Sequence, residues 1–446
     1  MSPELRKQKS FSKIRSKKPK ILFIGVGESS HDRSFTELFI DDFDVRFFAM
    51  PTFVPPNDWP IITYTTCPTP PMNMDPQNRI NLYPTPEDIQ SYVQHISTRK
   101  TIPLFLKRLY EEFSSSLNIL FRKMITLEDI LPPQIQVRSN SLNHWLIEII
   151  ESWQPDIIHT FGIERGFVLQ DSWEMLRGNS PKPFIWIQQT RGGSDLTFNR
   201  FDPAYKDRLL KLLHQCNSII CDNVINLKYL EEIGVDQNKF ASVCPVPGTG
   251  GLNINDQPPL SIQKHLDSRD IIWPKAYFLP YSMPIPVLEA IKIAWEKIQP
   301  CTIHMLPADQ GMRLWYYSLP KHIRNNCRIY DYMEKNDLLE LMRNSRITLA
   351  PSLIDGIPNV LYEAMIAGAL PIVSPLETIK SMVNEKNVLF ADNMNSQEIA
   401  NALISAMTND EMVSKMINRN IEFVKVNFNR QMFKSKLVNF YHSILS

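Results

Sequence analysis

Two carboxylates bracket a short predicted helix in the last third of the chain. Asp355 and Glu363 are separated by seven residues. Proline is favoured at the first position of a helix and glycine just beyond its end, so Pro358 and Gly368 predict a helix over 359–367. The free N–H groups at a helix N-terminus, with their partial positive charge, suit a diphosphate. A carboxylate one turn into the helix can bind a ribose diol, and one in the preceding loop can face a sugar ring.

This segment resembles the acidic-x7-acidic signature of the retaining GT-B glycosyltransferases of family 4, the glycosyl transferases group 1. Its usual form is Glu-Gly-x-Pro-Asn-x-x-x-Glu-Ala-x-x-x-Gly-x-Pro-Val. The matching positions here are Gly356, Pro358, Asn359, Glu363, Ala364, Gly368 and Pro371. Asp355 departs from the signature, because the family usually has glutamate there. The resemblance implies the α/β GT-B fold, in which two Rossmann-like domains face each other across a cleft.

The resemblance also implies a reaction. A sugar would move from a nucleotide-sugar donor to an acceptor hydroxyl with retention of configuration, in the synthesis of surface polysaccharide or of a lipid-linked glycan. Negative charge grows on the leaving diphosphate in the transition state, and fixed positive groups contribute most to stabilising it. A GT-B site does this with cationic side chains and helix N-termini, so we expect no metal and no cofactor besides the nucleotide-sugar substrate.

Three residues are predicted to act in catalysis. Lys275 follows a predicted strand at a position where the family commonly has an arginine on the donor phosphates, and Asp355 would face the donor sugar. The later lysine of the family is missing, because 279–282 reads Leu-Pro-Tyr-Ser. His159 matches the first histidine of a frequent His-x-His, whose second position is here Phe161.

Other residues are predicted to bind the donor or the acceptor. Glu363 would accept the ribose hydroxyls, and the surrounding segment would bind the diphosphate. Glycines allow close approach of backbone N–H groups to a phosphate, although Gly25-x-Gly27-x-x-Ser30 fails the dinucleotide pattern, which needs a third small glycine-like position. The acceptor side would include Gly193 and Asp195. The complete predicted donor set is Glu363, Gly356, Pro358, Asn359, Val360, Gly25 and Gly27.

Alternatives stay open at this point. Asp355, Glu363 and Lys275 could be solvated residues of an ordinary βαβ unit. A GT-B protein that binds sugar or partner enzymes without turnover would also explain the missing cation, Asp355 and Phe161. A GT-B sugar-nucleotide epimerase is a third hypothesis.

Composition excludes several other classes. The chain has 446 residues, 43% of them hydrophobic, and a formal net charge of +1, so bulk charge does not favour a nucleic-acid binder. Its six cysteines are scattered without a CxxC pair, which favours reduced thiols in a cytoplasmic protein. No apolar run is long enough to span a bilayer, and the N-terminus lacks an apolar signal core. The basic arm 1–20 is predicted to be solvated or to contact an anionic inner membrane face weakly.

Alternating strand and helix patterns predict two βα series and parallel sheets. The predicted strands are 21–25, 44–48, 155–162, 184–188, 218–221, 269–273, 302–306, 328–330, 347–350 and 370–373. The predicted helices are 34–40, 88–128, 142–153, 203–215, 225–233, 286–298, 312–318, 336–343, 359–367, 396–407, 409–425 and 430–444.

The expected domain plan follows this series. A basic arm covers 1–20, and an acceptor-side Rossmann-like domain covers 21–250 with an insertion at 51–150 whose segment 51–87 is irregular. A linker covers 251–268, and a nucleotide-sugar domain covers 269–429. The helical segment 430–446 would cross back to the first domain.

Overall fold

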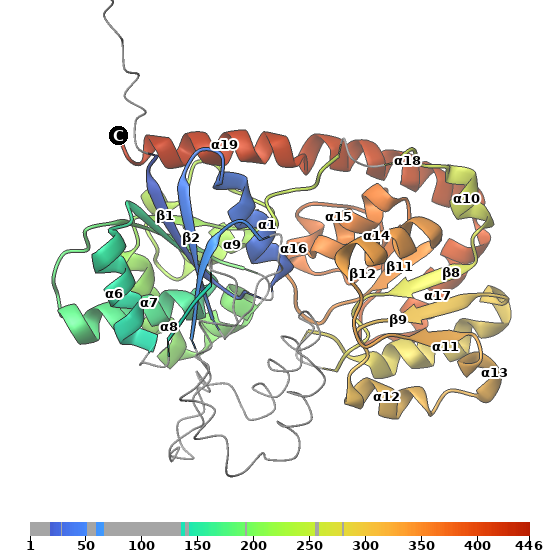
Figure 1. The fold of residues 1–446 in the computed structure, drawn as a ribbon. Coiled ribbons are helices and arrows are strands. Elements are labelled where there is room, and N and C mark those ends of the chain that lie inside the picture. The colour runs from blue at the N-terminus through green and yellow to red at the C-terminus, as the bar shows by residue number, and fades with distance from the viewer. Residues whose placement is uncertain are drawn as a thin grey trace, which may run out of the picture.

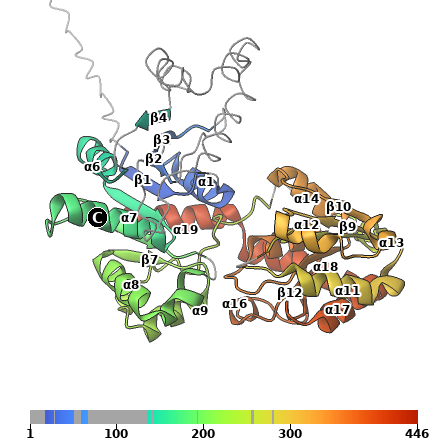
Figure 2. The same cartoon turned by 90° about the horizontal axis from the view of Figure 1, so that it is seen from below.

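The computed structural model describes residues 18–27, 29–50, 59–66, 135–138, 142–191, 194–254, 258–278 and 281–446. Within these ranges the chain forms two lobes, each built on one parallel β-sheet (Figure 1). A second view shows the same two lobes side by side (Figure 2). Most of the basic arm and the predicted helix 88–128 lie outside the described residues.

The first lobe contains a seven-stranded sheet with the order β4-β3-β2-β1-β5-β6-β7. Its central strands β1 and β5 are buried along almost their whole length, because helices cover both faces of a parallel sheet. The strands are β1 (Lys20–Gly25), β2 (Asp44–Ala49), β3 (Ile62–Thr66), β4 (Ile135–Arg138), β5 (Ile157–Phe161), β6 (Ile185–Gln189) and β7 (Ser218–Ile220). The prediction that 51–87 is irregular throughout is wrong, because β3 pairs with β2 inside it.

Helices flank both faces of this sheet. The helical elements are α1 (Ser30–Thr36), η1 (Glu37–Phe39), α6 (Leu142–Trp153), α7 (Ile163–Arg177), η2 (Ser194–Phe198), η3 (Asn199–Phe201), α8 (Pro203–Gln215), α9 (Val224–Glu232) and η4 (Gln237–Lys239). Helix α1 begins four residues before the predicted start at Ser34. The reason is its cap: the Ser29 hydroxyl accepts a hydrogen bond from the Asp32 N–H.

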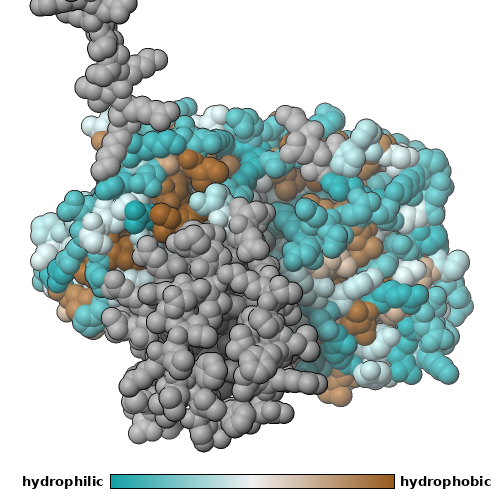
Figure 3. Space-filling view, viewed as in Figure 1, coloured by the Kyte–Doolittle hydropathy of each residue, from teal (hydrophilic) through white to brown (hydrophobic). Residues whose placement is uncertain are grey.

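The second lobe contains a six-stranded sheet with the order β10-β9-β8-β11-β12-β13. Its strands are β8 (Asp270–Trp273), β9 (Thr302–Met305), β10 (Cys327–Ile329), β11 (Ile347–Ala350), β12 (Leu370–Val373) and β13 (Leu389–Phe390). Its visible outer face is mostly hydrophilic, with apolar residues in small separate groups (Figure 3).

Ten helices follow in the C-terminal part of the described chain. They are α10 (Ile262–Asp267), α11 (Pro284–Ile298), α12 (Gln310–Tyr316), α13 (Lys321–Arg324), α14 (Lys335–Asn344), α15 (Asn359–Ala367), α16 (Glu377–Lys380), α17 (Ser396–Thr408), α18 (Asp410–Asn427) and α19 (Arg430–Ser443). Helix α10 lies inside the expected linker and contacts α14 and α18 of the second lobe. Pro358 is the N-cap of α15 and not its first residue, whereas Gly368 ends it with φ +86° as the glycine rule predicts.

Two chain crossings join the lobes. The Leu252 N–H donates to the Phe428 carbonyl over 2.7 Å, and the Arg430 N–H donates to the Leu252 carbonyl over 2.9 Å. The two crossing segments are therefore hydrogen-bonded to each other. Beyond them α19 packs on the first sheet, where Phe433, Leu437 and other apolar residues join its core. Helices α18 and α19 thus lie end to end along both lobes (Figure 1). None of the described helices has the length and apolar character that crossing a bilayer requires.

Candidate functional site

The chain order of each sheet indicates where a ligand would bind. In an open parallel sheet, ligands bind beyond the carboxyl ends of the strands, at the point where the strand order reverses. The second sheet reverses between the paired strands β8 and β11. Lys275 follows β8 and Asp355 lies in the loop after β11, so two residues that are 80 positions apart meet at this point.

Lys275 and Asp355 form an ion pair that is largely shielded from solvent. The side chains are 15% and 16% exposed, and the Ser352 hydroxyl bridges them, accepting from Lys275 Nζ and donating to Asp355 Oδ2 over 3.0 Å each. Thr378 anchors this loop, because its hydroxyl donates to the Asp355 carbonyl over 2.8 Å. The carboxylate and the cation are therefore both fixed at the strand ends.

Helix α15 presents its N-terminus and a second ion pair at the same place. Glu363 is 5% exposed, and its Oε1 lies 3.4 Å from Nζ of Lys335, the first residue of α14. The loop that leads into the helix is packed, since Gly356, Pro358 and Val360 are all buried. The free N–H groups at this helix N-terminus add partial positive charge beside the two ion pairs.

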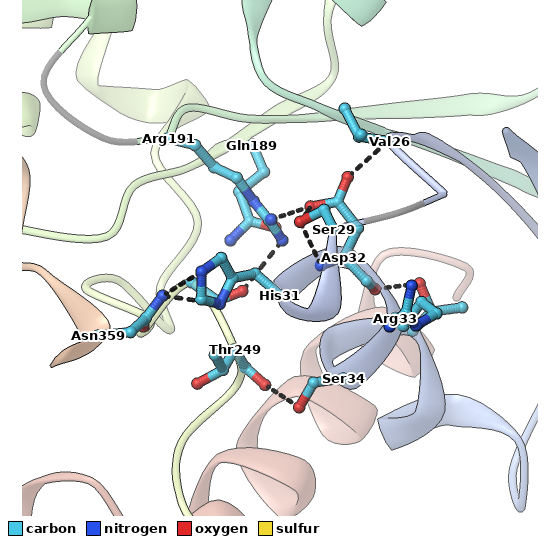
Figure 4. A network of polar contacts seen from close by, with 12 residues as sticks. Val26, Ser29, His31, Asp32, Arg33, Ser34, Gln189, Arg191, Thr249 and Asn359 are labelled. Atoms are coloured by element: carbon cyan, nitrogen blue, oxygen red, sulfur yellow. Dashed lines mark hydrogen bonds and ion pairs between the residues drawn. The ribbon is translucent and has the colours of Figure 1, made fainter. Parts of the chain in front are cut away.

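The first lobe contacts this N-terminus directly. The Asn359 side-chain amide lies 2.9 Å from Nδ1 and 3.2 Å from Nε2 of His31, which follows β1 at the start of α1 (Figure 4). Burial first, and then the positive charges of Arg191, Lys335 and Lys275, lower the pKa of His31 to about 3. The imidazole is therefore neutral at physiological pH.

A third ion pair, Arg191–Asp32, comes from the first lobe. Arg191 also donates to the Gly248 carbonyl over 3.0 Å, while Oδ2 of Asp32 accepts from the Val26 N–H over 2.8 Å. Gly25 lies beneath this carboxylate, because a Cβ there would come within 2.5 Å of Asp32 Oδ2. Glycine is required at this strand end by the close approach of Asp32.

Three cations, each with its own carboxylate, thus converge on the boundary between the lobes. An anionic ligand would replace the carboxylates as partners of the cations, and the freed carboxylates would be available to sugar hydroxyls. Three buried polar atoms lack a hydrogen-bond partner there, namely Nε2 of Gln189, Nε of Arg191 and Oδ1 of Asn359. Buried polar groups are usually paired, so a polar ligand or water is their natural complement.

The structure brings together part of the predicted set. Lys275, Asp355, Glu363 and Asn359 lie together as described, and the loop glycine and proline shape their surroundings. Gly27 lies in the turn after β1, where its carbonyl accepts from Arg33 over 2.7 Å. Gly193 lies outside the described residues.

His159 lies elsewhere, in the first-lobe core. It is fully buried and contacts the Tyr441 hydroxyl through Nδ1, while Nε2 lies 3.0 Å from Oε1 of Gln189. The rings of Phe23, Phe35 and Phe161 surround it, and burial lowers its pKa well below the usual value. These are the contacts of a core residue that anchors α19, and they do not support the predicted catalytic role of His159.

Asp195 is buried close to the site. Its carboxylate accepts the Arg191 N–H over 2.6 Å, and burial raises its pKa to about 7. Asp195 therefore lies on the first-lobe side of the boundary, next to Arg191.

Sequence reasoning missed three members of this site. Lys335 brings a second lysine to α15 in addition to Lys275, and no spacing signal links it to Glu363. His31 and Asp32 follow Ser29, and the capping pattern of α1 could have placed them at a helix start beside β1.

Comparisons with known proteins agree with this architecture. Residues 281–423, most of the second lobe, match the family described as glycosyl transferases group 1. Sucrose-phosphate synthase from Thermosynechococcus elongatus is 13% identical with a TM-score of 0.62, covering 96% of this chain and 99% of that chain. HepE of Anabaena, solved in complex with UDP-glucose, is 12% identical with a TM-score of 0.63, covering 95% and 99%. The chain has the GT-B fold.

The fold itself is shared by more than one type of enzyme. A putative UDP-N-acetylglucosamine 2-epimerase from Listeria monocytogenes is 12% identical with a TM-score of 0.50, covering 90% of each chain. No curated protein sequence matches this chain significantly. The family match and the GT-B neighbours support a glycosyltransferase, and the chemistry must be argued from the site.

Proposed function

We propose that the protein is a retaining glycosyltransferase of the family 4 type, which moves a sugar from a nucleotide-sugar donor to an acceptor hydroxyl. One observation carries the proposal. The pairs Lys275–Asp355 and Lys335–Glu363 flank the N-terminus of α15, where it meets the first lobe. A nucleotide sugar needs this combination of groups, because it carries a diphosphate between two sets of hydroxyls.

The roles follow from the chemistry of each group. The two lysines and the N–H groups of α15 would bind the diphosphate, Glu363 the ribose hydroxyls and Asp355 the transferred sugar. A cation about 4 Å from one phosphate charge contributes roughly 4 kcal/mol at an effective dielectric constant of 20. Two such cations, strengthened as charge moves onto the leaving group, would stabilise the transition state appreciably.

Retention and metal independence belong to the same proposal. The leaving phosphate itself would accept the acceptor proton on the face from which it departs, so no protein nucleophile is required. Lys275 and Lys335 would then neutralise the diphosphate in place of a divalent cation. Full activity in the presence of EDTA is the expected result.

The proposal also covers the class of acceptor and the cellular location. We propose a glycan or lipid-linked acceptor bound on the first-lobe side near Gly193 and Asp195, in a cytoplasmic protein whose basic arm contacts an anionic membrane face. The buried, partnerless Gln189 and Arg191 nitrogens support a polar acceptor. The concentration of lysine and arginine in 1–20 supports the membrane contact.

A second candidate is a GT-B protein that binds nucleotide sugars without turnover. Asp355 favours it, since its carboxylate is one methylene short of the family glutamate and misplacement by about 1 Å can cost roughly 10²-fold in rate. Lys335 argues against a protein without turnover, because with Lys275 the site holds two lysines that could neutralise the leaving diphosphate.

The deciding experiment measures nucleotide release from UDP-, ADP- and GDP-sugars with a panel of sugar and lipid acceptors. We expect acceptor-dependent release with one donor, and strong loss in Lys275→Met and Glu363→Gln. Lys292→Met is the matched control, because Lys292 pairs with Glu289 on the surface of α11. Tight donor binding without any release would favour the binding protein, and no binding of any donor would refute both.

A further inference from the structure

His31 has no assigned role in the proposed reaction. Its imidazole lies between the two lobes, against the side chain of the first residue of α15. The diphosphate that the proposed function places at this helix N-terminus would therefore lie close to the imidazole. No other histidine of the described residues contacts α15 through a hydrogen bond at its N-terminus.

The charged groups around His31 form three sets. Arg191 with Asp32 and Asp195 belongs to the first lobe, Lys275 with Asp355 follows β8 and β11, and Lys335 with Glu363 joins α14 and α15. The cations are Arg191, Lys275 and Lys335, and the acidic groups are Asp32, Asp195, Asp355 and Glu363. Burial and the three cations keep the pKa of His31 low, at about 3, while no diphosphate is present.

Asn359 is suited to either protonation state of the imidazole. In this structure its Nδ2 faces the ring, as a donor to a neutral imidazole nitrogen, and its Oδ1 is buried without a partner. A 180° rotation of the amide exchanges the two atoms and presents an acceptor to an imidazolium N–H. A neutral imidazole offers this oxygen an N–H on one ring nitrogen only, whereas an imidazolium offers an N–H on both, so the contact is favoured most when His31 is protonated.

We propose that His31 takes up one proton from solvent when the donor diphosphate binds at the N-terminus of α15, and that the imidazolium adds a further positive charge beside the leaving group. This inference rests on the proposed function. The balance is one proton gained by His31 and one lost by the buffer, with no bond made or broken in the donor.

The size of the effect can be worked out from electrostatics. A charge of about −2 at roughly 5 Å raises the pKa of an imidazole by about 5 at an effective dielectric constant of 20. The pKa of His31 would then rise from about 3 to the neutral range on binding. The donor would bind more weakly as the pH increases, by up to about tenfold per pH unit.

The test is calorimetric titration of the protein with UDP-, ADP- and GDP-glucose near pH 6 in buffers of different ionisation enthalpy. These diphosphate diesters do not titrate near neutral pH, so any uptake belongs to the protein. We expect close to one proton per bound donor, and none in His31→Asn or His31→Gln. Either variant should bind the donor about 10- to 100-fold more weakly near pH 6, with the difference shrinking toward pH 9.

His214→Asn is the matched control, because His214 is exposed at the end of α8 far from the site. The His214→Asn variant should take up one proton per bound donor, as the unmodified protein does. Donor binding without proton uptake, or with uptake that persists in both His31 variants, overturns the inference and leaves the proposed function standing. Failure of all three donors to bind contradicts the proposed function and the inference with it.

Discussion

Removing the carboxylate of Asp355 should tighten the binding of a free nucleoside diphosphate while it strongly slows sugar transfer. In this structure Lys275 is bound to Asp355, and both side chains are about 85% shielded from solvent. A phosphate that approaches Lys275 must displace Asp355. Asp355→Asn keeps the shape of the side chain but removes the competing charge.

The magnitude follows from the geometry of this pair. Two unit charges about 4 Å apart attract each other by roughly 4 kcal/mol at an effective dielectric constant of 20, and desolvation and side-chain entropy cancel part of that. A net cost of about 1 to 2 kcal/mol for breaking the pair leaves a 5- to 30-fold gain in affinity for UDP in Asp355→Asn. Lys275→Met should weaken the same binding.

The assay is calorimetric titration with UDP at low and at high ionic strength, beside a transfer assay. The gain in affinity should shrink with added salt, and turnover should fall by about 10² or more. Asp331→Asn is the matched control, since Asp331 pairs with Arg313 at an exposed position. Weaker UDP binding in Asp355→Asn would refute the reasoning, because it would show that Asp355 supports the anion.

Three further changes test the framework of the first lobe by urea unfolding. Gly25→Ala places a Cβ 2.5 Å from Asp32 Oδ2, and such overpacking should cost about 1 to 3 kcal/mol. Tyr441→Phe leaves Nδ1 of buried His159 unpaired and should cost about 1 to 3 kcal/mol. Burial raises the pKa of Asp195 to about 7, above its unfolded value, so its contribution to stability is present in acid and is lost as the pH rises toward 7. Asp195→Asn should therefore stabilise the protein by about 2 to 4 kcal/mol at pH 8 and change little near pH 4.

Each of these changes has a control and a contrary outcome. A Cβ at Gly311 would lie 3.2 Å from the Phe278 side chain and 3.6 Å from Asp309 Oδ1, so Gly311→Ala should cost less than Gly25→Ala. Tyr317→Phe alters an exposed tyrosine and should be neutral, so an equal loss there would remove the reason given for Tyr441. A stability profile that stays unchanged in Asp195→Asn would show that Asp195 is ionised in the fold.

Most elements of the fold could be predicted from the sequence because they depend on local rules. Helix α15 ends at Gly368 since only glycine adopts φ +86° there without strain, and β11 is a short apolar run before a loop. Strand β3 was missed because a proline- and threonine-rich segment lacks the usual strand pattern. It is a strand because β2 and β4 pair with it on either side.

The site was predictable only where a motif spans it. Asp355, Glu363 and Asn359 belong to one segment of sequence, so the resemblance identified them together. Lys335 and His31 reach the site from α14 and α1, and only the packing of two sheets and two lobes brings them to α15. His159 matched a motif by position, but β5 directs it into the aromatic core.

Amide hydrogen exchange at the start of α15, with and without a bound nucleotide sugar, tests the central claim most directly. If the diphosphate binds this helix N-terminus, the N–H groups of Asn359 and Val360 should exchange much more slowly in the complex. Unchanged exchange there, with new protection confined to another part of the chain, would contradict the account.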